Sequence, residues 1–222
     1  MSRHVFLTGA TGYVGSRLIP LLLSRGHRVT ALVREQSRHK LPAGCEAAIG
    51  DALDGDSYRH LLNGADTFVQ LVGVAHPGPA KARQFVEIDL KSGLEAVRVA
   101  STVRMAHFVY VSVAHPAPAM HAYIRVRSQC ERAIEESGLN ATILRPWYVL
   151  GPGHRWPYVL LPFYKLAEVW PSTRASAQRL GLVTLAQMVE ALAQSVDHPP
   201  QGTRILEVPA IRGYSQPLSM RR

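Results

Sequence analysis

The chain has 222 residues, and 47% of them are hydrophobic, so it is long and apolar enough for one sizeable core. It has no 18-residue apolar run for a membrane-spanning helix, and its two cysteines form no CxxC pair that would indicate a disulfide framework or a cysteine zinc site. The net charge of +9 is spread without a Lys/Arg run, so we expect no nucleic-acid partner, and the free cysteines without a signal-peptide layout predict a cytoplasmic protein.

Short apolar runs alternate along the chain with longer amphipathic segments. The apolar runs predict strands at 4–9, 28–33, 46–50, 66–72, 107–112 and 141–145, with a last strand at 203–208. The amphipathic segments predict helices at 12–25, from Asp54 or Asp56 through Leu62, and at 81–104, 121–137 and 184–196. Buried strands that alternate with helices form βαβ units, so we expect an α/β fold with a parallel sheet and helices on both of its faces.

The pattern changes after Pro146, where the chain becomes rich in Gly, Pro and aromatic residues. No linker separates this part from the rest. We therefore predict a single domain over 1–222, in which 146–222 contributes a small C-terminal cap on the substrate side. The aromatic side chains of 156–170 either pack the cap or form the wall of an apolar substrate pocket.

A glycine-rich motif, TGATGYVG, runs from Thr8 to Gly15, directly after the first predicted strand and at the start of the first predicted helix. Glycines at 9, 12 and 15 let the backbone approach a pyrophosphate, and the helix N-terminus offers free N–H groups and a positive dipole end. The strand, glycine turn, helix and second strand together predict dinucleotide binding. The alternative is a tight packing turn without a ligand.

Arg34 follows the second predicted strand, at the place where an acid usually holds the ribose 2′-hydroxyl of NAD. An arginine suits the 2′-phosphate of NADP instead. We therefore expect NADP as the cofactor, with NAD as the alternative because Glu35 is adjacent. Asp51, in the GDALD segment after the third strand, is expected to face adenine or to cap a helix.

These motifs, with the VYVS strand, a tyrosine followed four residues later by a base, and the segment SGLNATILRP, resemble one family. It is the short-chain dehydrogenase/reductase superfamily in its extended or atypical branch. The chain looks most like the small NAD(P)H-binding proteins related to NmrA-like regulators and to the 39-kDa accessory subunit of respiratory complex I. The resemblance covers the whole chain, is most specific over residues 5–150, and fixes no substrate.

The resemblance implies a Rossmann-type, doubly wound parallel sheet with the cofactor lying across the strand ends. It assigns the pyrophosphate to the glycine turn, the adenosine to the ends of the second and third strands, and the nicotinamide half to two later segments. The implied cofactor-binding residues are Gly9, Thr11, Gly12, Tyr13, Val14, Gly15, Arg34, Asp51, Ala52, Val72, Gly73, Val74, Pro146, Trp147, Tyr148 and Val149. No metal is expected.

The catalytic residues implied by the resemblance are Tyr123, Arg127 and Ser112. In such enzymes a tyrosine transfers a proton, a lysine four residues later lowers its pKa, and a hydroxyl orients the substrate carbonyl. Residues i and i+4 share one face of a helix, so both side chains can reach the same cofactor. Here Arg127 replaces the lysine; we expect its charge to lower the tyrosine pKa, although arginine does not readily release a proton. The hydroxyl position is either Ser112 or, one residue later, Val113, which has none.

The sequence therefore predicts an NADP(H)-dependent oxidoreductase with an altered catalytic site, acting on a small apolar or aromatic carbonyl or a quinone-like substrate. Two alternatives stay open: a non-catalytic dinucleotide-binding sensor or accessory protein, and an epimerase or dehydratase that holds NAD(P) tightly. The echoed AHP segments add His76 and His115, each expected to be extended before its proline, as loop residues or substrate contacts.

Overall fold

The structure is a computed structural model that describes residues 2–117, 119–152 and 179–214. Its centre is a seven-stranded sheet with the order β3-β2-β1-β4-β5-β6-β9, in which every neighbouring pair is parallel. The strands are β1 His4–Thr8, β2 Arg28–Val33, β3 Glu46–Ile49, β4 Thr67–Gln70, β5 His107–Val111, β6 Ala141–Arg145 and β9 Thr203–Glu207. The predicted α/β fold with a doubly wound parallel sheet is confirmed, and each predicted strand is present with small shifts at its ends.

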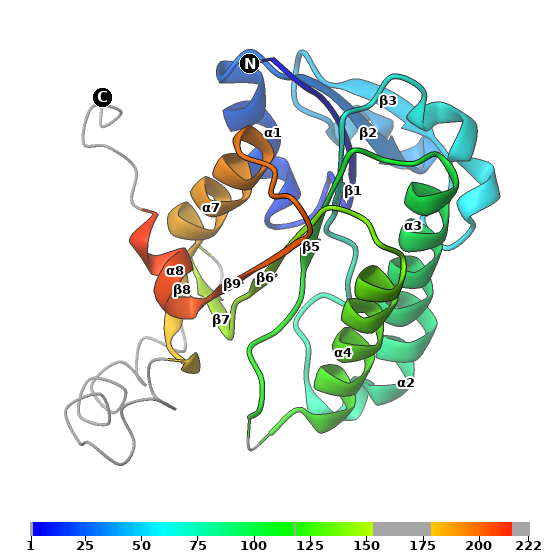
Figure 1. The fold of residues 1–222 in the computed structure, drawn as a ribbon. Helices are drawn as coiled ribbons and strands as arrows, with labels where there is room; N and C mark the ends of the chain where they lie inside the picture. The colour runs from blue at the N-terminus through cyan, green and yellow to red at the C-terminus, as the bar shows by residue number, and fades with distance from the viewer. Residues whose placement is uncertain (1, 118, 153–178, 215–222) are drawn as a thin grey trace.

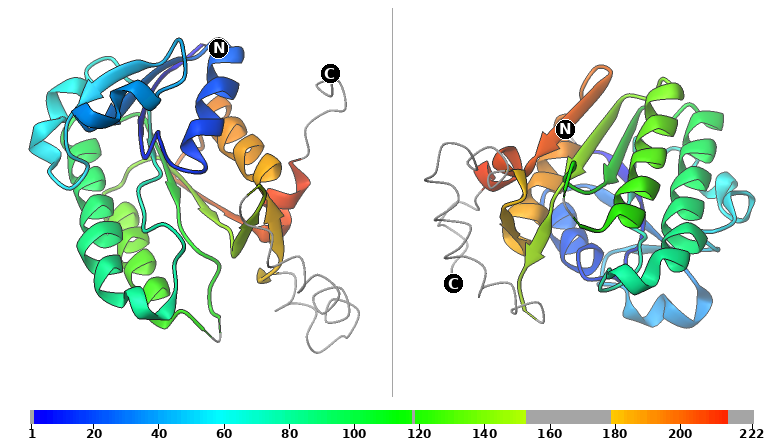
Figure 2. Two further views of the ribbon diagram at one scale, coloured as in Figure 1. Left: turned by 180° about the vertical axis from the view of Figure 1, so that it is seen from behind. Right: turned by 90° about the horizontal axis from the view of Figure 1, so that it is seen from below.

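Helices cover both faces of the sheet (Figure 1, Figure 2). Helices α1 (Gly15–Ser24) and α7 (Leu185–Asp197) lie on one face, and α3 (Lys91–Thr102) and α4 (His121–Glu136) lie on the other. Strand β1 shows how its alternation fills both layers: Val5 and Leu7 belong to the core under α1 and α7, and Phe6 to the core under α3 and α4. Burying a side chain such as Phe6 contributes about 1.5–3 kcal/mol.

The strand order places β1 between β2 and β4. After β3 the chain returns across the sheet and adds β4 on the other side of β1. In a parallel sheet, the point where the order reverses opens a crevice at the carboxyl ends of the strands, where ligands bind. The glycine turn after β1, the segment after β2 and the segment after β4 all reach this edge.

Two predicted helices are wrong in form. The segment predicted from Asp54 or Asp56 to Leu62 consists of two short 3₁₀ turns, η2 (Gly55–Ser57) and η3 (Arg59–Leu62). Asp54 does cap the first turn, since its side chain accepts a hydrogen bond from the Asp56 N–H. Tyr58 then turns into the core with φ −131° and ψ −4°, and these angles interrupt the helix.

The predicted helix at 81–104 is also divided. It begins with η4 (Pro79–Lys81) and α2 (Ala82–Gln84), passes through a π-helical segment η5 (Phe85–Leu90), and continues as α3. A π-turn is defined by its i→i+5 hydrogen bonds, and apolar composition does not specify which hydrogen bonds a turn takes. Helix α1 likewise begins at Gly15 and not at residue 12, because the glycine turn occupies the preceding residues.

The described C-terminal part adds a small parallel pair, β7 (Tyr148–Leu150) with β8 (Leu182–Thr184), and a helix α8 (Val208–Gly213). Thr184 and Gln187 form a capping box at the start of α7, close to the predicted helix start. The aromatic segment 156–170 lies outside the described residues, and the single-domain organisation with a cap stays a prediction. Across the described ranges, no helix is long and apolar enough to cross a membrane.

Candidate functional site

The turn between β1 and α1 is built by glycines that no other residue can replace without displacement. Gly9 has φ +74°, and a Cβ on it would lie 2.7 Å from the Leu71 carbonyl carbon. A Cβ on Gly15 would lie 2.3 Å from the Gly9 oxygen. Val14 gives α1 no side-chain cap, and the first turn contains no acid, so the N-terminus of this helix is suited to an anion.

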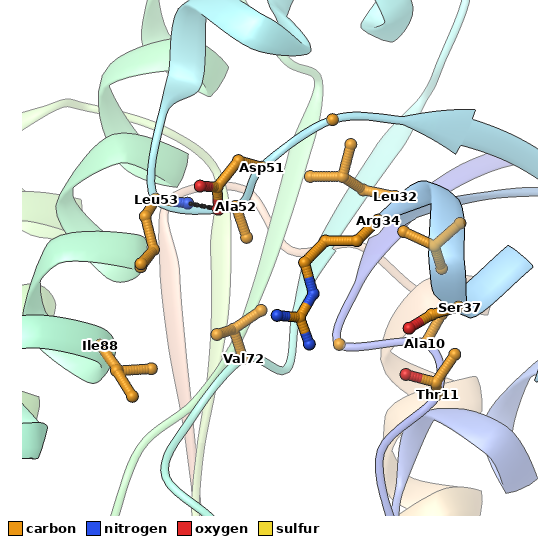
Figure 3. A pocket seen from close by; sticks show the side chains of 13 residues that line it. Ala10, Thr11, Leu32, Arg34, Ser37, Asp51, Ala52, Leu53, Val72 and Ile88 are labelled. Atoms are coloured by element: carbon orange, nitrogen blue, oxygen red, sulfur yellow. Dashed lines mark hydrogen bonds between the residues drawn. The ribbon is translucent and has the colours of Figure 1, made fainter.

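A cavity of about 290 Å³ opens beside this turn (Figure 3). The Arg34 side chain extends into it, so that its guanidinium lies between Val72 and the Ala10–Thr11 backbone. This volume is at the lower end for a small-molecule pocket, so it suits one half of a dinucleotide. The cavity is lined by Gly9, Ala10, Thr11, Leu32, Val33, Arg34, Ser37, Gly50, Asp51, Ala52, Leu53, Val72 and Ile88.

Arg34 and Asp51 are the charged side chains among the described residues that line the cavity. One oxygen of Asp51 accepts a hydrogen bond from the Leu53 N–H at 2.9 Å, which turns the carboxylate toward its own loop (Figure 3). Glu35 is exposed and does not line the cavity, so the acid that kept NAD open as an alternative is absent from the lining. Sequence reasoning missed Ser37, whose hydroxyl-bearing side chain lies one turn after Arg34.

Helix α4 carries the second predicted cluster. Tyr123 and Arg127 lie one turn apart on the same face, and the Arg127 guanidinium carbon is 5.0 Å from the centre of the Tyr123 ring. The ring of Phe85, from η5, packs against Tyr123 with 4.9 Å between the ring centres. The structure therefore brings the predicted tyrosine and base together, as their spacing indicates.

Arg127 is enclosed by hydrogen-bond partners. Its guanidinium donates to Asp89 at 2.5 Å, to the Tyr110 hydroxyl at 3.2 Å and to the Val111 carbonyl at 2.9 Å. Asp89 and Arg127 are both buried, so this is an interior ion pair. A Cβ on Gly73 would lie 2.4 Å from the guanidinium, so the glycine leaves the space in which Arg127 lies. Asp89 was missed from the sequence, where Glu87 and Asp89 are two acids in an amphipathic run.

The expected lowering of the Tyr123 pKa is wrong in direction. Burial raises the pKa of the Tyr123 hydroxyl above its ordinary value, and the charge of Arg127 offsets only part of this rise. The Asp89 charge acts against Arg127 and also raises the tyrosine pKa. Burial is therefore the main reason why the nearby cation does not lower the pKa of Tyr123, and the Asp89 charge adds to the effect of burial.

Ser112 is buried at the end of β5, and its Oγ forms no hydrogen bond of normal geometry with the described residues. The Ser112 side chain lies near Glu131. Glu131 is on α4, one turn after Arg127. Burial alone would raise the pKa of the Glu131 carboxyl, but the hydrogen bond from Arg145 and the nearby Ser112 hydroxyl bring it below its ordinary value. His115 approaches the same carboxylate at 3.4 Å. Val113, the alternative to Ser112, is a buried core residue.

Of the two segments implied for the nicotinamide half, the one after β4 contacts this cluster. Val74 donates its N–H to Asp89 at 3.0 Å, and the Ala114 N–H donates to the Pro146 carbonyl at 2.9 Å. Trp147 packs against the core under α1 and α7, and Tyr148 and Val149 belong to β7.

His76 has φ 49°, so the expected extended conformation is wrong there. Tyr13 lies near Gly151, where a Cβ would meet its hydroxyl at 2.3 Å.

Comparison with known proteins matches the chain to an NAD(P)H-binding family and to two bacterial relatives. A family model described as NAD(P)H-binding matches residues 9–161. The chain is 29% identical over 153 residues to the ceramide reductase of Caulobacter vibrioides, a match that covers 67% of this chain and 47% of that protein. It is also 29% identical over 153 residues to the uncharacterized sugar epimerase YhfK of Bacillus subtilis, covering 64% of this chain and 70% of that protein. The chain thus spans about half the length of the first of these relatives.

A solved structure has the same fold. The Bordetella bronchiseptica enzyme WbmH, determined in complex with NAD⁺, superposes with a TM-score of 0.70 at 23% identity. The match covers 93% of this chain and 76% of that chain. At this identity, the likeness shows the fold alone.

Proposed function

Because the chain belongs to the NAD(P)H-binding family of the short-chain dehydrogenase/reductase superfamily, we propose that it is an NADP(H)-dependent oxidoreductase that reduces a small apolar or aromatic carbonyl or a quinone-like substrate. The observation that carries this proposal is Tyr123. Its ring packs on Phe85 of η5 and lies beside Arg127 on one face of α4, and burial raises its pKa, so that its hydroxyl is protonated. A protonated tyrosine is the form that can give a proton to a substrate oxygen during reduction.

The residues at the other end of the crevice fit the cofactor. The N-terminus of α1, which has no side-chain cap and no acid in its first turn, suits a pyrophosphate, and the neighbouring cavity suits the adenosine half. Arg34 and Ser37 would hold the 2′-phosphate of NADP, and Asp51 with Ala52 would lie at the adenine. When bound, the cofactor supplies the hydride. Val72, Gly73 and Pro146 would lie beside its nicotinamide half.

Three side chains have proposed roles in the reaction. Tyr123 donates the proton, and Arg127 holds the tyrosine ring through a cation–π contact over the face of the ring. Ser112 is assigned a different role from the predicted one. Its Oγ is buried near Glu131, where it helps to lower the pKa of that carboxyl, and we place substrate orientation on Tyr123.

The proposed substrate class rests on the name of one relative. The relative from Caulobacter vibrioides is named a ceramide reductase, so an apolar carbonyl compound or quinone is the class to screen first. The aromatic segment 156–170, which the sequence offers as the pocket wall, lies outside the described residues.

The test has two stages. Calorimetric titration of the purified protein with NADPH and with NADH should show tighter binding of NADPH. A screen of aryl ketones and quinones should then reveal NADPH oxidation that Tyr123→Phe lowers by about 10²–10⁴-fold, the usual effect of removing a general acid. Tyr214→Phe, after α8, is the control and should keep full activity. Equal activity of Y123F and wild type would disprove the catalytic role.

A second candidate is a dinucleotide-binding protein without catalysis. The observation that favours it is the engagement of Arg127 with Asp89, Tyr110 and Val111, which draws the cation away from the role that a lysine has in the superfamily. This reading predicts NADPH binding with no hydride transfer to any substrate in the screen, and unchanged NADPH affinity in Y123F.

An epimerase that holds NAD(P) tightly is the third candidate, supported by the name of the Bacillus subtilis relative. It predicts that the protein is purified with cofactor already bound, and that a nucleotide sugar is converted without net consumption of NADPH. Absorbance at the NADPH band during such a reaction separates it from the reductase.

A further inference from the structure

Two helices face each other at the tyrosine and contribute matched pairs of side chains. On η5, Phe85 and Asp89 are four residues apart, and on α4, Tyr123 and Arg127 have the same spacing. Phe85 packs on Tyr123 with 4.9 Å between ring centres, and Asp89 accepts from Arg127 at 2.5 Å. The two contacts fix α4 relative to η5 in both position and rotation.

Asp89 also contacts a segment outside the two helices. Its other oxygen accepts the N–H of Val74 at 3.0 Å, so one carboxylate joins Arg127 to the segment that follows β4. Gly73 closes the arrangement, since a Cβ there would lie 2.4 Å from the Arg127 guanidinium and 3.0 Å from the Asp89 oxygen. The backbone at Gly73 and Val74 therefore rests directly on the ion pair.

The π-helical form of η5 affects how Asp89 projects from the chain. Asp89 lies in a π-helical segment, and such segments are frequent at functional sites because they alter the direction in which side chains project. Asp89 is 1% exposed, so its position is set by its contacts and not by solvent. Burial raises the pKa of the Asp89 carboxyl above its ordinary value, and Arg127 and the Val74 N–H offset only part of this rise.

We propose that Asp89 is a positioning residue, which uses Arg127 to fix the Gly73–Val74 backbone for the nicotinamide half of the dinucleotide. The inference rests on the proposed function, since it assumes that this segment lies against that half. Arg127 thereby fixes the conformation of the Gly73–Val74 backbone. A lysine at this position in the superfamily would contact the ribose of the cofactor directly. The adenosine half, held by Arg34 and the glycine turn, does not depend on Asp89.

The experiment compares two ligands on one variant. NADPH engages both halves of the crevice, whereas adenosine 2′,5′-bisphosphate engages the adenosine half alone. We expect Asp89→Asn to weaken NADPH binding by about tenfold, the effect of losing one charge-assisted hydrogen bond, and to leave the bisphosphate affinity within about twofold. Glu87→Gln is the matched control: it removes an acid from the same helix, but Glu87 is exposed and pairs with Arg83. It should bind both ligands as wild type does.

Each result has one meaning. Equal weakening of both ligands by D89N would show a general structural defect and overturn the proposal, as would unchanged NADPH affinity. Failure of the wild-type protein to bind either ligand would instead overturn the proposed function. If D89N does not fold, Gly73→Ala tests the same contact from the loop side, because its new Cβ displaces the guanidinium. It should reproduce the selective loss of NADPH, and equal loss of both ligands would again contradict the proposal.

Discussion

The two ends of the crevice hold an arginine in opposite ways. Arg34 extends into an open cavity whose lining is largely backbone and apolar side chains. Arg127 is buried and surrounded by a carboxylate, a phenol and a carbonyl oxygen. A guanidinium that meets open space is available to an anionic ligand, and one whose donors are already engaged contributes to structure. The same residue type therefore has different functions at the two ends, and its partners decide which.

The largest expected effect concerns the end of the crevice where Arg127 pairs with Asp89. Arg127→Met leaves the Asp89 carboxylate buried without its cation, which should lower the free energy of unfolding by about 3–5 kcal/mol. The double variant D89N/R127M removes both charges and should recover most of that loss. Chemical denaturation of the three proteins measures it.

The exposed pair Arg83–Glu87 supplies the control for this prediction. Both of its side chains are more than half exposed, so Arg83→Met should leave the unfolding curve nearly unchanged. If R127M were as stable as R83M, the description of Arg127 as an interior structural cation would be wrong.

The next effect tests the glycine turn at the open end. Gly9→Ala places a Cβ 2.7 Å from the Leu71 backbone, at a residue with φ +74°. Gly64→Ala has nearly the same backbone strain, at φ +77°, but no atom lies within 4 Å of the new Cβ. We expect G64A to cost about 1 kcal/mol of stability, and G9A about 1–3 kcal/mol more. Thermal unfolding gives the difference, and equal losses would mean that crowding at Gly9 is relieved.

A smaller effect tests the open arginine. Arg34→Ala should weaken NADPH binding by about 10–100-fold, because charge-assisted hydrogen bonds to the 2′-phosphate are lost. Binding of NADH, which has no such phosphate, should change by less than about threefold. Arg38→Ala is the control, since Arg38 lies in the 3₁₀ helix Glu35–Lys40 that directly follows Arg34 but does not line the cavity. Parallel losses for both cofactors would remove the basis for NADP preference.

The smallest effect is an absence of change with pH. Because burial raises the pKa of Tyr123, the protonated acid is present up to and beyond its ordinary value of about 10 and is lost only above that. The rate of reduction at saturating cofactor should therefore be level between about pH 7 and 9. A rate that falls through this range would show that the tyrosine pKa is lowered when the cofactor is bound, as the simple reading of a neighbouring base predicts.

Much of the open end could be predicted from the sequence. The glycine motif, the strand before it and Arg34 after β2 are contiguous features, and each acts through its own backbone or its immediate neighbours. Ser37, the residue missed there, lies in a short 3₁₀ helix, Glu35–Lys40, and lines the cavity only because of the tertiary fold. The divided helix at 81–104 shows the same limit, since apolar composition does not specify whether a turn takes α or π hydrogen bonds.

The sequence by itself determined the alternation of strands and helices, the glycine turn, and the placement of Tyr123 and Arg127 on one helical face. These follow from short-range periodicity and from glycine conformations, which are local properties of the chain. The tertiary structure alone decided what Arg127 does. Its partner Asp89 is 38 residues away, on another helix, and only the packing of η5 against α4 under the β4 loop brings the two charges into contact.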